Sequence, residues 1–138
     1  MATCNSCPNT TSGQICESNS KAPSACSPGT IPNSDGTSCE RCPAGHFCST
    51  PSNQPLPCAD GQWALEGSTS CNDCPKGYFC SDPTRRPQPC STSGTYTDGV
   101  NSKSCKVCEK GFMCPTPTGS PIPCTAGDSL FFFQTNYL

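Results

Sequence analysis

The sixteen cysteines are the residues of this chain with the most chemistry to offer. Most recur as C-x(12–14)-C-x2-C-x5-C, followed by nine residues and the next unit, which gives a period of about 32–34 residues. A C-x2-C pair beside further cysteines can form disulfides, hold zinc or act as a redox couple. Self-similarity at a fixed period of this size indicates a repeat array.

Structural disulfides fit this chain better than zinc or redox chemistry. Four cysteines per unit match a Cys4 zinc site in number, but the only histidine is His46, and it stands where Tyr78 and Phe112 stand in the other units. We expect His46 to be a surface side chain. A redox C-x2-C needs a low-pKa thiolate, commonly at a helix start, and these pairs are followed by proline or glutamate in loops. We therefore expect no metal and no cofactor.

Composition leads to the same class. Leu, Ile, Val and Phe total 15 of 138 residues, which is too few for an ordinary core. Covalent cross-links must then oppose the chain's conformational entropy. Because disulfides persist in oxidising compartments, we expect an extracellular or cell-surface protein. The net charge is −2 with no basic run, so nothing indicates binding to nucleic acid or to an anionic membrane.

The start of the chain, Met1-Ala-Thr-Cys4, lacks the basic and apolar parts of a signal peptide. If the protein is secreted, Met1 is an added residue or the edge of a fragment. Asn9-Thr10-Thr11 is a glycosylation sequon, so glycans at Asn9 are expected on secretion, although a chance occurrence also explains it. The high Ser, Thr and Pro content also permits O-linked glycans.

The spacing divides the chain into three complete repeats and two partial ones. The predicted class is small disulfide-rich repeats of short β-hairpins and irregular loops, forming an elongated rod with little or no helix. The predicted boundaries are 1–25 for a partial repeat, 26–57, 58–89 and 90–123 for complete repeats, and 124–138 for a partial repeat with an aromatic tail.

Each complete repeat has two halves. The first carries an apolar residue and then a turn at Ser34-Asp35-Gly36, Glu66-Gly67 or Asp98-Gly99, where glycine accepts a positive φ. In the second half, C-x2-C-P-x-G-aromatic predicts positive φ at Gly45, Gly77 and Gly111. Phe47, Phe79 and Met113 are expected to pack on the disulfides, and the proline-rich ends to form extended connectors.

The repeat suggests that disulfides close locally, although sixteen cysteines allow on the order of two million pairings. The hypothesis joins the first two cysteines of a repeat and then the last two. The resulting pairs are Cys26–Cys39, Cys58–Cys71, Cys90–Cys105, Cys42–Cys48, Cys74–Cys80, Cys108–Cys114 and Cys7–Cys16.

Cys4 and Cys124 are left over, and they are the two halves of one missing loop. Two molecules arranged head to tail could join them, and such a contact, if it does not close, gives a filament. An equally good interpretation is that the chain is a slice of a longer repeat protein.

The last residues depart from the repeat. Leu130, Phe131, Phe132, Phe133 and Tyr137 belong to an uncharged, β-prone window, which is too short to span a bilayer. One interpretation folds this tail back on the last repeat. The other docks it on a neighbouring subunit as an assembly contact.

The core C-x2-C-P-x-G-[FY]-[FM]-C resembles ephrin-receptor-like cysteine-rich repeats, and the array is similar to those of protist surface antigens and flagellar hair (mastigoneme) proteins. It occurs at Cys39–Cys48, Cys71–Cys80 and Cys105–Cys114, with Glu109 in place of proline in the last. The resemblance covers residues 4–127 and implies a module type used in spacers, adhesive stalks and fibre walls.

No catalytic motif is visible: the sequence has no G-x-S-x-G, no phosphate-binding glycine loop and no calcium loop. We therefore expect a non-enzymatic protein. Two functions compete. The first is a structural subunit of an extracellular filament or appendage, with itself or neighbouring fibre subunits as partners. The second is a binding or adhesion ectodomain, such as a surface antigen or receptor stalk.

Overall fold

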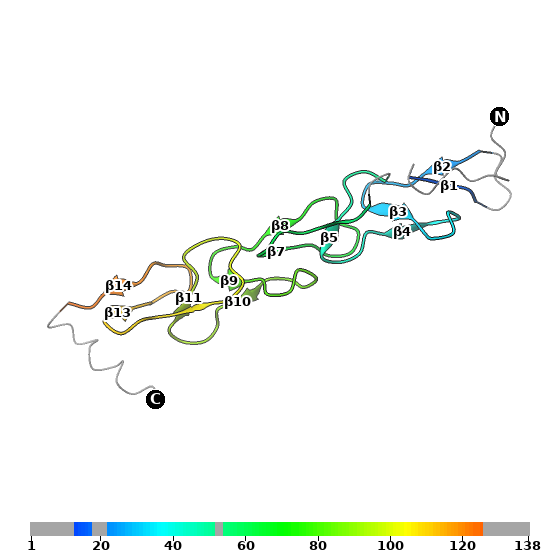
Figure 1. Cartoon of the computed structure of the whole chain (residues 1–138). Helices are drawn as coiled ribbons and strands as arrows, with labels where there is room; N and C mark the ends of the chain where they lie inside the picture. The colour runs from blue at the N-terminus through cyan, green and yellow to red at the C-terminus, as the bar shows by residue number, and fades with distance from the viewer. Residues whose placement is uncertain (1–12, 18–21, 52–53, 126–138) are drawn as a thin grey trace. The chain divides into compact units, whose positions relative to one another are not determined.

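The computed structural model describes residues 13–17, 22–51 and 54–125. Within these ranges the backbone forms fourteen strands of two or three residues and no helix. The strands pair only with their neighbours in sequence, in seven antiparallel hairpins (Figure 1). The same ranges contain no helix of the length and apolarity that crossing a membrane requires. The predicted class of small disulfide-rich repeats built from short hairpins and loops is therefore confirmed for these residues.

Three of the hairpins have their first strand between the first two cysteines of a repeat and their second strand at or directly after the second cysteine, and we call them opening hairpins. Each begins with a tight turn in which the first residue of the first strand donates to the carbonyl three residues earlier, as Thr30 N–H does to Ser27 O at 3.0 Å. They are β3 (Thr30–Pro32) with β4 (Cys39–Arg41), β7 (Gln62–Trp63) with β8 (Asn72–Asp73), and β11 (Thr95–Tyr96) with β12 (Lys106–Val107).

The other four hairpins lie between the last two cysteines of one repeat and the first cysteine of the next, and we call them closing hairpins. In the three complete repeats, the register places an aromatic residue opposite the final proline, as in His46 and Phe47 opposite Pro57 and Leu56. They are β1 (Gln14–Ile15) with β2 (Ser24–Ala25), β5 (His46–Phe47) with β6 (Leu56–Pro57), β9 (Tyr78–Phe79) with β10 (Gln88–Pro89), and β13 (Phe112–Met113) with β14 (Ile122–Pro123).

The proline-rich ends were predicted to be extended connectors, but they also contribute strands. Their last two residues are the second strands of the closing hairpins, for example Leu56–Pro57 and Gln88–Pro89. Proline is tolerated in these strands because a two-stranded hairpin has only edges, so its missing N–H removes no bond from a central ladder.

Positive φ occurs at the predicted glycines of the closing hairpins, with 78° at Gly45, 81° at Gly77 and 87° at Gly111. In the third opening hairpin the prediction of Gly99 is wrong, because the positive φ of 59° falls on Asn101. The third loop is two residues longer, and the turn keeps its distance from the second cysteine rather than from the first. Asn101 therefore takes the place that Gly67 has, and asparagine tolerates this conformation better than most residues.

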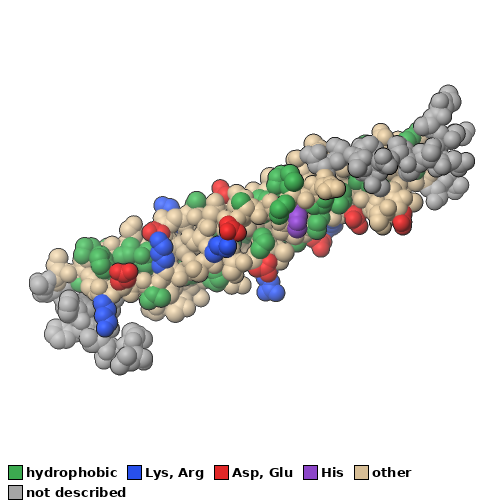
Figure 2. All heavy atoms as spheres, in the orientation of Figure 1, with side chains coloured by type: hydrophobic (Ala, Val, Ile, Leu, Met, Phe, Trp, Pro, Cys, Tyr) green, Lys and Arg blue, Asp and Glu red, His purple; other side chains and the backbone are tan. Residues whose placement is uncertain are grey.

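Sulfur forms most of the interior. Seven of the ten buried apolar residues in the described ranges are cysteines, and the others are Ile15, Ala64 and Tyr96. Phe47 and Phe79 are only half-buried. On the face shown in Figure 2, hydrophobic side chains lie in separate small groups among polar atoms. The disulfides therefore do the work that aliphatic burial does in larger cores.

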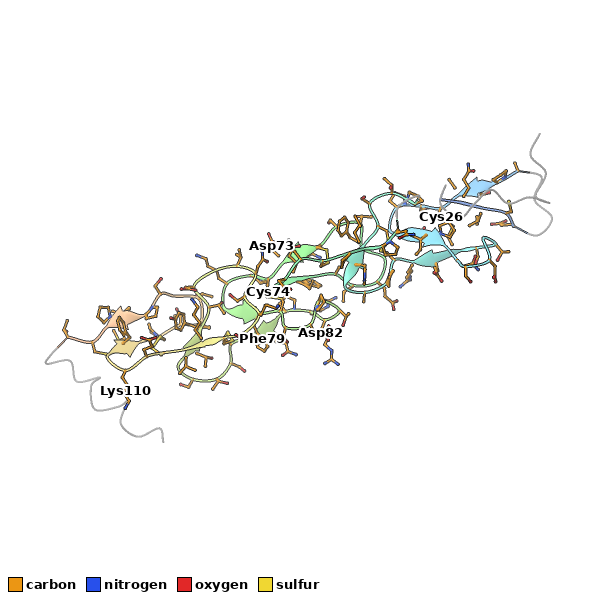
Figure 3. All side chains as sticks on the ribbon, in the orientation of Figure 1. Cys26, Asp73, Cys74, Phe79, Asp82 and Lys110 are labelled. Carbon is orange, nitrogen blue, oxygen red and sulfur yellow. A yellow bond between two sulfur atoms is a disulfide. The ribbon has the colours of Figure 1, made fainter. Side chains whose placement is uncertain are left out.

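The chain divides into two compact units. One comprises Met1–Asp73 with Asp82–Arg86, and the other comprises Cys74–Ser81 with Pro87–Leu138. The division falls between Asp73 and Cys74, both labelled in Figure 3, and it does not coincide with a predicted repeat boundary. A loop of the third closing hairpin, residues 82–86, therefore belongs to the first unit.

Candidate assembly interface between consecutive repeats

Six disulfides join described cysteines, and each closes the first or the last pair of a repeat. By the chain-entropy relation, a loop of about 13 residues contributes about 3 kcal/mol and a loop of about 6 residues about 2 kcal/mol. The six are the pairs that the local hypothesis proposes: Cys26–Cys39, Cys42–Cys48, Cys58–Cys71, Cys74–Cys80, Cys90–Cys105 and Cys108–Cys114.

Several predicted site residues lie outside the described ranges. Cys16 is disulfide-bonded, and its predicted partner Cys7 is among the residues not described. The others outside are Cys4, Asn9 and the tail residues Leu130, Phe131, Phe132, Phe133 and Tyr137.

In the first unit, the second closing hairpin receives the opening hairpin of the next repeat. Three backbone hydrogen bonds make this contact, and two of them use the cysteines of one disulfide. Gly45 N–H donates to Ala64 O (2.8 Å), Gly67 N–H donates to Cys42 O (2.8 Å), and Cys48 N–H donates to Ser68 O (3.0 Å).

The second unit has the same contact one period later, except that a side-chain oxygen replaces one backbone carbonyl as the acceptor. The third opening hairpin also adds a side-chain bond from Asn101, which clamps Cys74 through both of its backbone groups. Asn101 N–H donates to Cys74 O (2.8 Å), Cys74 N–H donates to Asn101 Oδ1 (2.9 Å), Cys80 N–H donates to Ser102 O (2.8 Å), and Gly77 N–H donates to Thr97 Oγ1 (2.6 Å).

One of these bonds recurs in the first partial repeat, where Cys16 N–H donates to Gly36 O at 2.8 Å. The same backbone group of the last cysteine is therefore bonded to the next opening hairpin at all three described junctions. Since backbone groups make most of these bonds, the contact tolerates variation in side chains.

Each of the second and third opening hairpins also donates a backbone hydrogen bond to the loop of the closing hairpin that follows it. Ala64 N–H donates to Pro83 O at 3.0 Å, and Thr97 N–H donates to Pro117 O at 2.9 Å. Both acceptors lie in the loop of the closing hairpin that follows in sequence. Pro32 occupies this position in the first complete repeat, and it has no N–H to donate.

The tips of these loops contact the glycines of the preceding closing hairpin. A Cβ built on Gly45 would lie 3.1 Å from Thr84 Cγ2, and one built on Gly77 would lie 2.6 Å from Thr118 Cγ2. The glycine of C-x2-C-P-x-G is thus required twice, once for its positive φ and once because a threonine methyl group fills the space beside it.

Asp82 holds Thr84 in this orientation. Its Oδ1 accepts hydrogen bonds from Thr84 Oγ1 (2.6 Å) and Thr84 N–H (2.9 Å), and its Oδ2 lies 3.3 Å from Arg85 Nε. The bond from the Thr84 hydroxyl is the main cause that lowers the pKa of Asp82 below its usual value, and Arg85 adds to it. The threonine hydroxyl is therefore tied down while its methyl group faces Gly45.

Cys124 has the position of the first cysteine of a repeat. Its N–H donates to Gly111 O at 2.8 Å, as Cys58 N–H does to Gly45 O and Cys90 N–H does to Gly77 O. Cys124 is half-buried, and its thiol is unpaired among the described residues. The backbone therefore presents this thiol where the two earlier cysteines start a disulfide-closed loop.

The junctions consist of backbone amides, carbonyl groups, cystines and threonines. Across the described ranges, no group of three His, Cys, Asp or Glu residues is placed to hold a metal ion. No family model, no curated protein and no solved structure matches the chain. What the residues support directly is a contact that joins like hairpins in series.

Proposed function

We propose that this chain is a non-enzymatic structural repeat protein of the cell exterior, a subunit of a filament or surface appendage that assembles head to tail. The observation that carries the proposal is the junction itself. One closing hairpin binds the next opening hairpin through the same backbone groups in both compact units. A contact that is specific in geometry and tolerant in sequence suits serial addition of subunits.

The covalent chemistry supports the location. Six disulfides among the described residues are stable only in an oxidising compartment, such as the cell exterior or the secretory lumen. The likeness of the cysteine core to the repeats of surface antigens and flagellar hair proteins points to the same setting. Glycans on Asn9 and on the Ser/Thr/Pro-rich loops belong to this proposal, and intact-mass measurement of native material reports them.

Cys124 and Cys4 are the proposed covalent link between subunits. Cys124 has the position of a cysteine that opens a repeat, and Cys4 has, in sequence, the position of the second cysteine of a repeat. A disulfide between two copies would complete one hairpin at each junction. The aromatic tail, residues 130–138, is the proposed noncovalent contact beside it, because burial of its phenylalanines on a neighbour would remove a large apolar area from water.

Electron microscopy and sizing of the native protein over a dilution series test this function. Deletion of residues 130–138 is expected to abolish ordered polymers, and Cys124→Ser is expected to make them dissociate on dilution. The matched control replaces Gln134, Thr135 and Asn136 by serine, which keeps the tail length and its aromatic residues. A chain that stays monomeric with and without the tail would favour the alternative, a surface antigen or receptor-stalk ectodomain.

A further inference from the structure

The fourth closing hairpin, β13 with β14, carries the same receiving groups as the second and third. Its Cys108 C=O, Gly111 N–H and Cys114 N–H correspond to the groups of the earlier hairpins that bind the next opening hairpin. None of these three groups has a hydrogen-bond partner in the described part of the chain. They form an end face, which we define as Cys108, Gly111 and Cys114 with the adjoining Gly94.

The cysteines of this end face are more exposed than the corresponding cysteines of the second and third closing hairpins. Cys42, Cys48 and Cys74 are fully buried, at 0 % exposure, whereas Cys108 and Cys114 are half-exposed. The disulfide that is covered by a hairpin in the earlier repeats is therefore accessible in the last one.

The glycines show the same difference. Gly45 and Gly77 are buried against threonine methyl groups, whereas Gly111 is exposed and a Cβ on it would meet no atom within 4 Å. Gly29 is packed so closely on the carbonyl of Gly67 that a side chain could not fit, whereas its counterpart Gly94 again has open space. The space beside Gly29, Gly45 and Gly77 is therefore filled by other residues, whereas the space beside Gly94 and Gly111 is open.

We infer that this end face is a docking site for one more opening hairpin of the same repeat type, a disulfide-closed loop of 12 to 14 residues. The partner is defined by what the earlier junctions use: a carbonyl for Gly111 N–H, an N–H for Cys108 O and a carbonyl for Cys114 N–H. A threonine at the tip of the following loop then fills the space over Gly111, as Thr84 and Thr118 do upstream. This inference names the recognised element, and it does not depend on the proposed filament.

The test grafts the partner onto the full chain. Residues 125–138 are replaced by a second copy of residues 59–90, and amide hydrogen exchange is followed by NMR at Gly111 and Cys114. Exchange is expected to slow about tenfold or more relative to the unaltered chain at low concentration, approaching the rates at Gly45 and Cys48. Peptide mapping establishes that Cys124 pairs with the first cysteine of the graft, so that the hairpin is closed.

Two controls make the result specific. A graft whose residues between those two cysteines are a Gly-Ser stretch of equal length is expected to give no protection. Gly111→Ala in the grafted chain is expected to reduce the protection at Cys114, and Gly99→Ala, which also meets open space but lies off the end face, is expected to leave it unchanged. Disulfide mapping of each variant shows whether its hairpins remain intact.

A closed graft without slower exchange at Gly111 and Cys114 would overturn the inference. Slow exchange already present in the dilute, unaltered chain would also overturn it, because residues 126–138 would then be the occupant. Protection that appears in the unaltered chain only as concentration rises would support it and identify a second copy as the source. If no polymer forms at any concentration, the proposed function falls, while the graft still decides this inference.

Discussion

Thr97 Oγ1 accepts a hydrogen bond of 2.6 Å from Gly77 N–H, in the position where the first unit uses the backbone carbonyl of Ala64 to bind Gly45 N–H. Thr97 is the one buried polar residue among those described, at 0 % exposure. The loop that carries Thr97 is two residues longer than its counterparts, so its backbone takes another course and a side chain supplies the acceptor.

Thr97→Val is expected to destabilise the second unit by about 1–3 kcal/mol, because it keeps the shape of the side chain and leaves the buried Gly77 N–H without an acceptor. Thr97→Ser is expected to cost less, since it keeps the hydroxyl group. Chemical denaturation with disulfides intact measures both changes. Equal losses for the two variants would show that packing of the methyl group, rather than the hydrogen bond, carries the contact.

Gly77→Ala and Gly111→Ala form a matched pair, since the two glycines have φ values of 81° and 87°. Both variants are expected to lose about 1–3 kcal/mol to backbone strain. Gly77→Ala is expected to lose about 1–3 kcal/mol more, because its Cβ meets Thr118 at 2.6 Å whereas that of Gly111 meets nothing. Indistinguishable denaturation midpoints would contradict the packing of the loop on Gly77.

Proteolytic fragments of the unreduced protein are expected to contain only the local cystine pairs, including Cys7–Cys16 beyond the described ranges. Mass spectrometry before and after reduction identifies them. Arg41, Asp73, Arg85 and Lys106 lie between neighbouring cystine pairs, so trypsin combined with an Asp-specific protease separates most of the disulfides. A single crossed pair in material that is folded by amide exchange would refute the local scheme.

The carboxylate of Asp82 has a lowered pKa, chiefly because the Thr84 hydroxyl donates to it. A lowered pKa in the folded state means that this interaction stabilises the protein above the ordinary carboxyl pKa and is lost as the pH falls through the lowered value. Thr84→Val is expected to raise the pKa of Asp82 while keeping a methyl group beside Gly45. The carboxyl ¹³C shift followed against pH measures this.

Arg85→Ala provides the comparison for that titration. It removes the smallest of the effects that lower the pKa of Asp82, so the rise is expected to be less than for Thr84→Val. A larger rise in Arg85→Ala would mean that charge, rather than the hydrogen bond, sets the pKa of this carboxyl.

Much of the fold could be predicted from spacing alone. The cysteine period predicted the hairpins, and the glycine of C-x2-C-P-x-G predicted the positive φ at Gly45, Gly77 and Gly111. These features are local, since each depends on residues a few positions apart. The shift from Gly99 to Asn101 could not be read from an Asp-Gly pair, because the turn is set by distance from the second cysteine.

The junction was not predicted, because its partners lie about 19 to 41 residues apart in sequence. Backbone donors and acceptors carry most of it, and they leave no mark in residue types. The one available signal was the Pro-Thr pair that recurs in the loops of two repeats, at Pro83-Thr84 and Pro117-Thr118. Its meaning becomes clear only when Thr84 is found against Gly45.

The segments that pack together belong to two consecutive repeats, because each closing hairpin contacts the opening hairpin of the next repeat. A closing hairpin is covered by material encoded after it, so a chain cut before Cys58 would strip the cover from the Cys42–Cys48 disulfide. Deletion of one whole period of about 32 residues, wherever it starts, would instead join the first part of one repeat to the matching second part of the next. We therefore expect that insertion or deletion of a whole period preserves the disulfides and the junctions better than a shorter insertion or deletion next to a cysteine does.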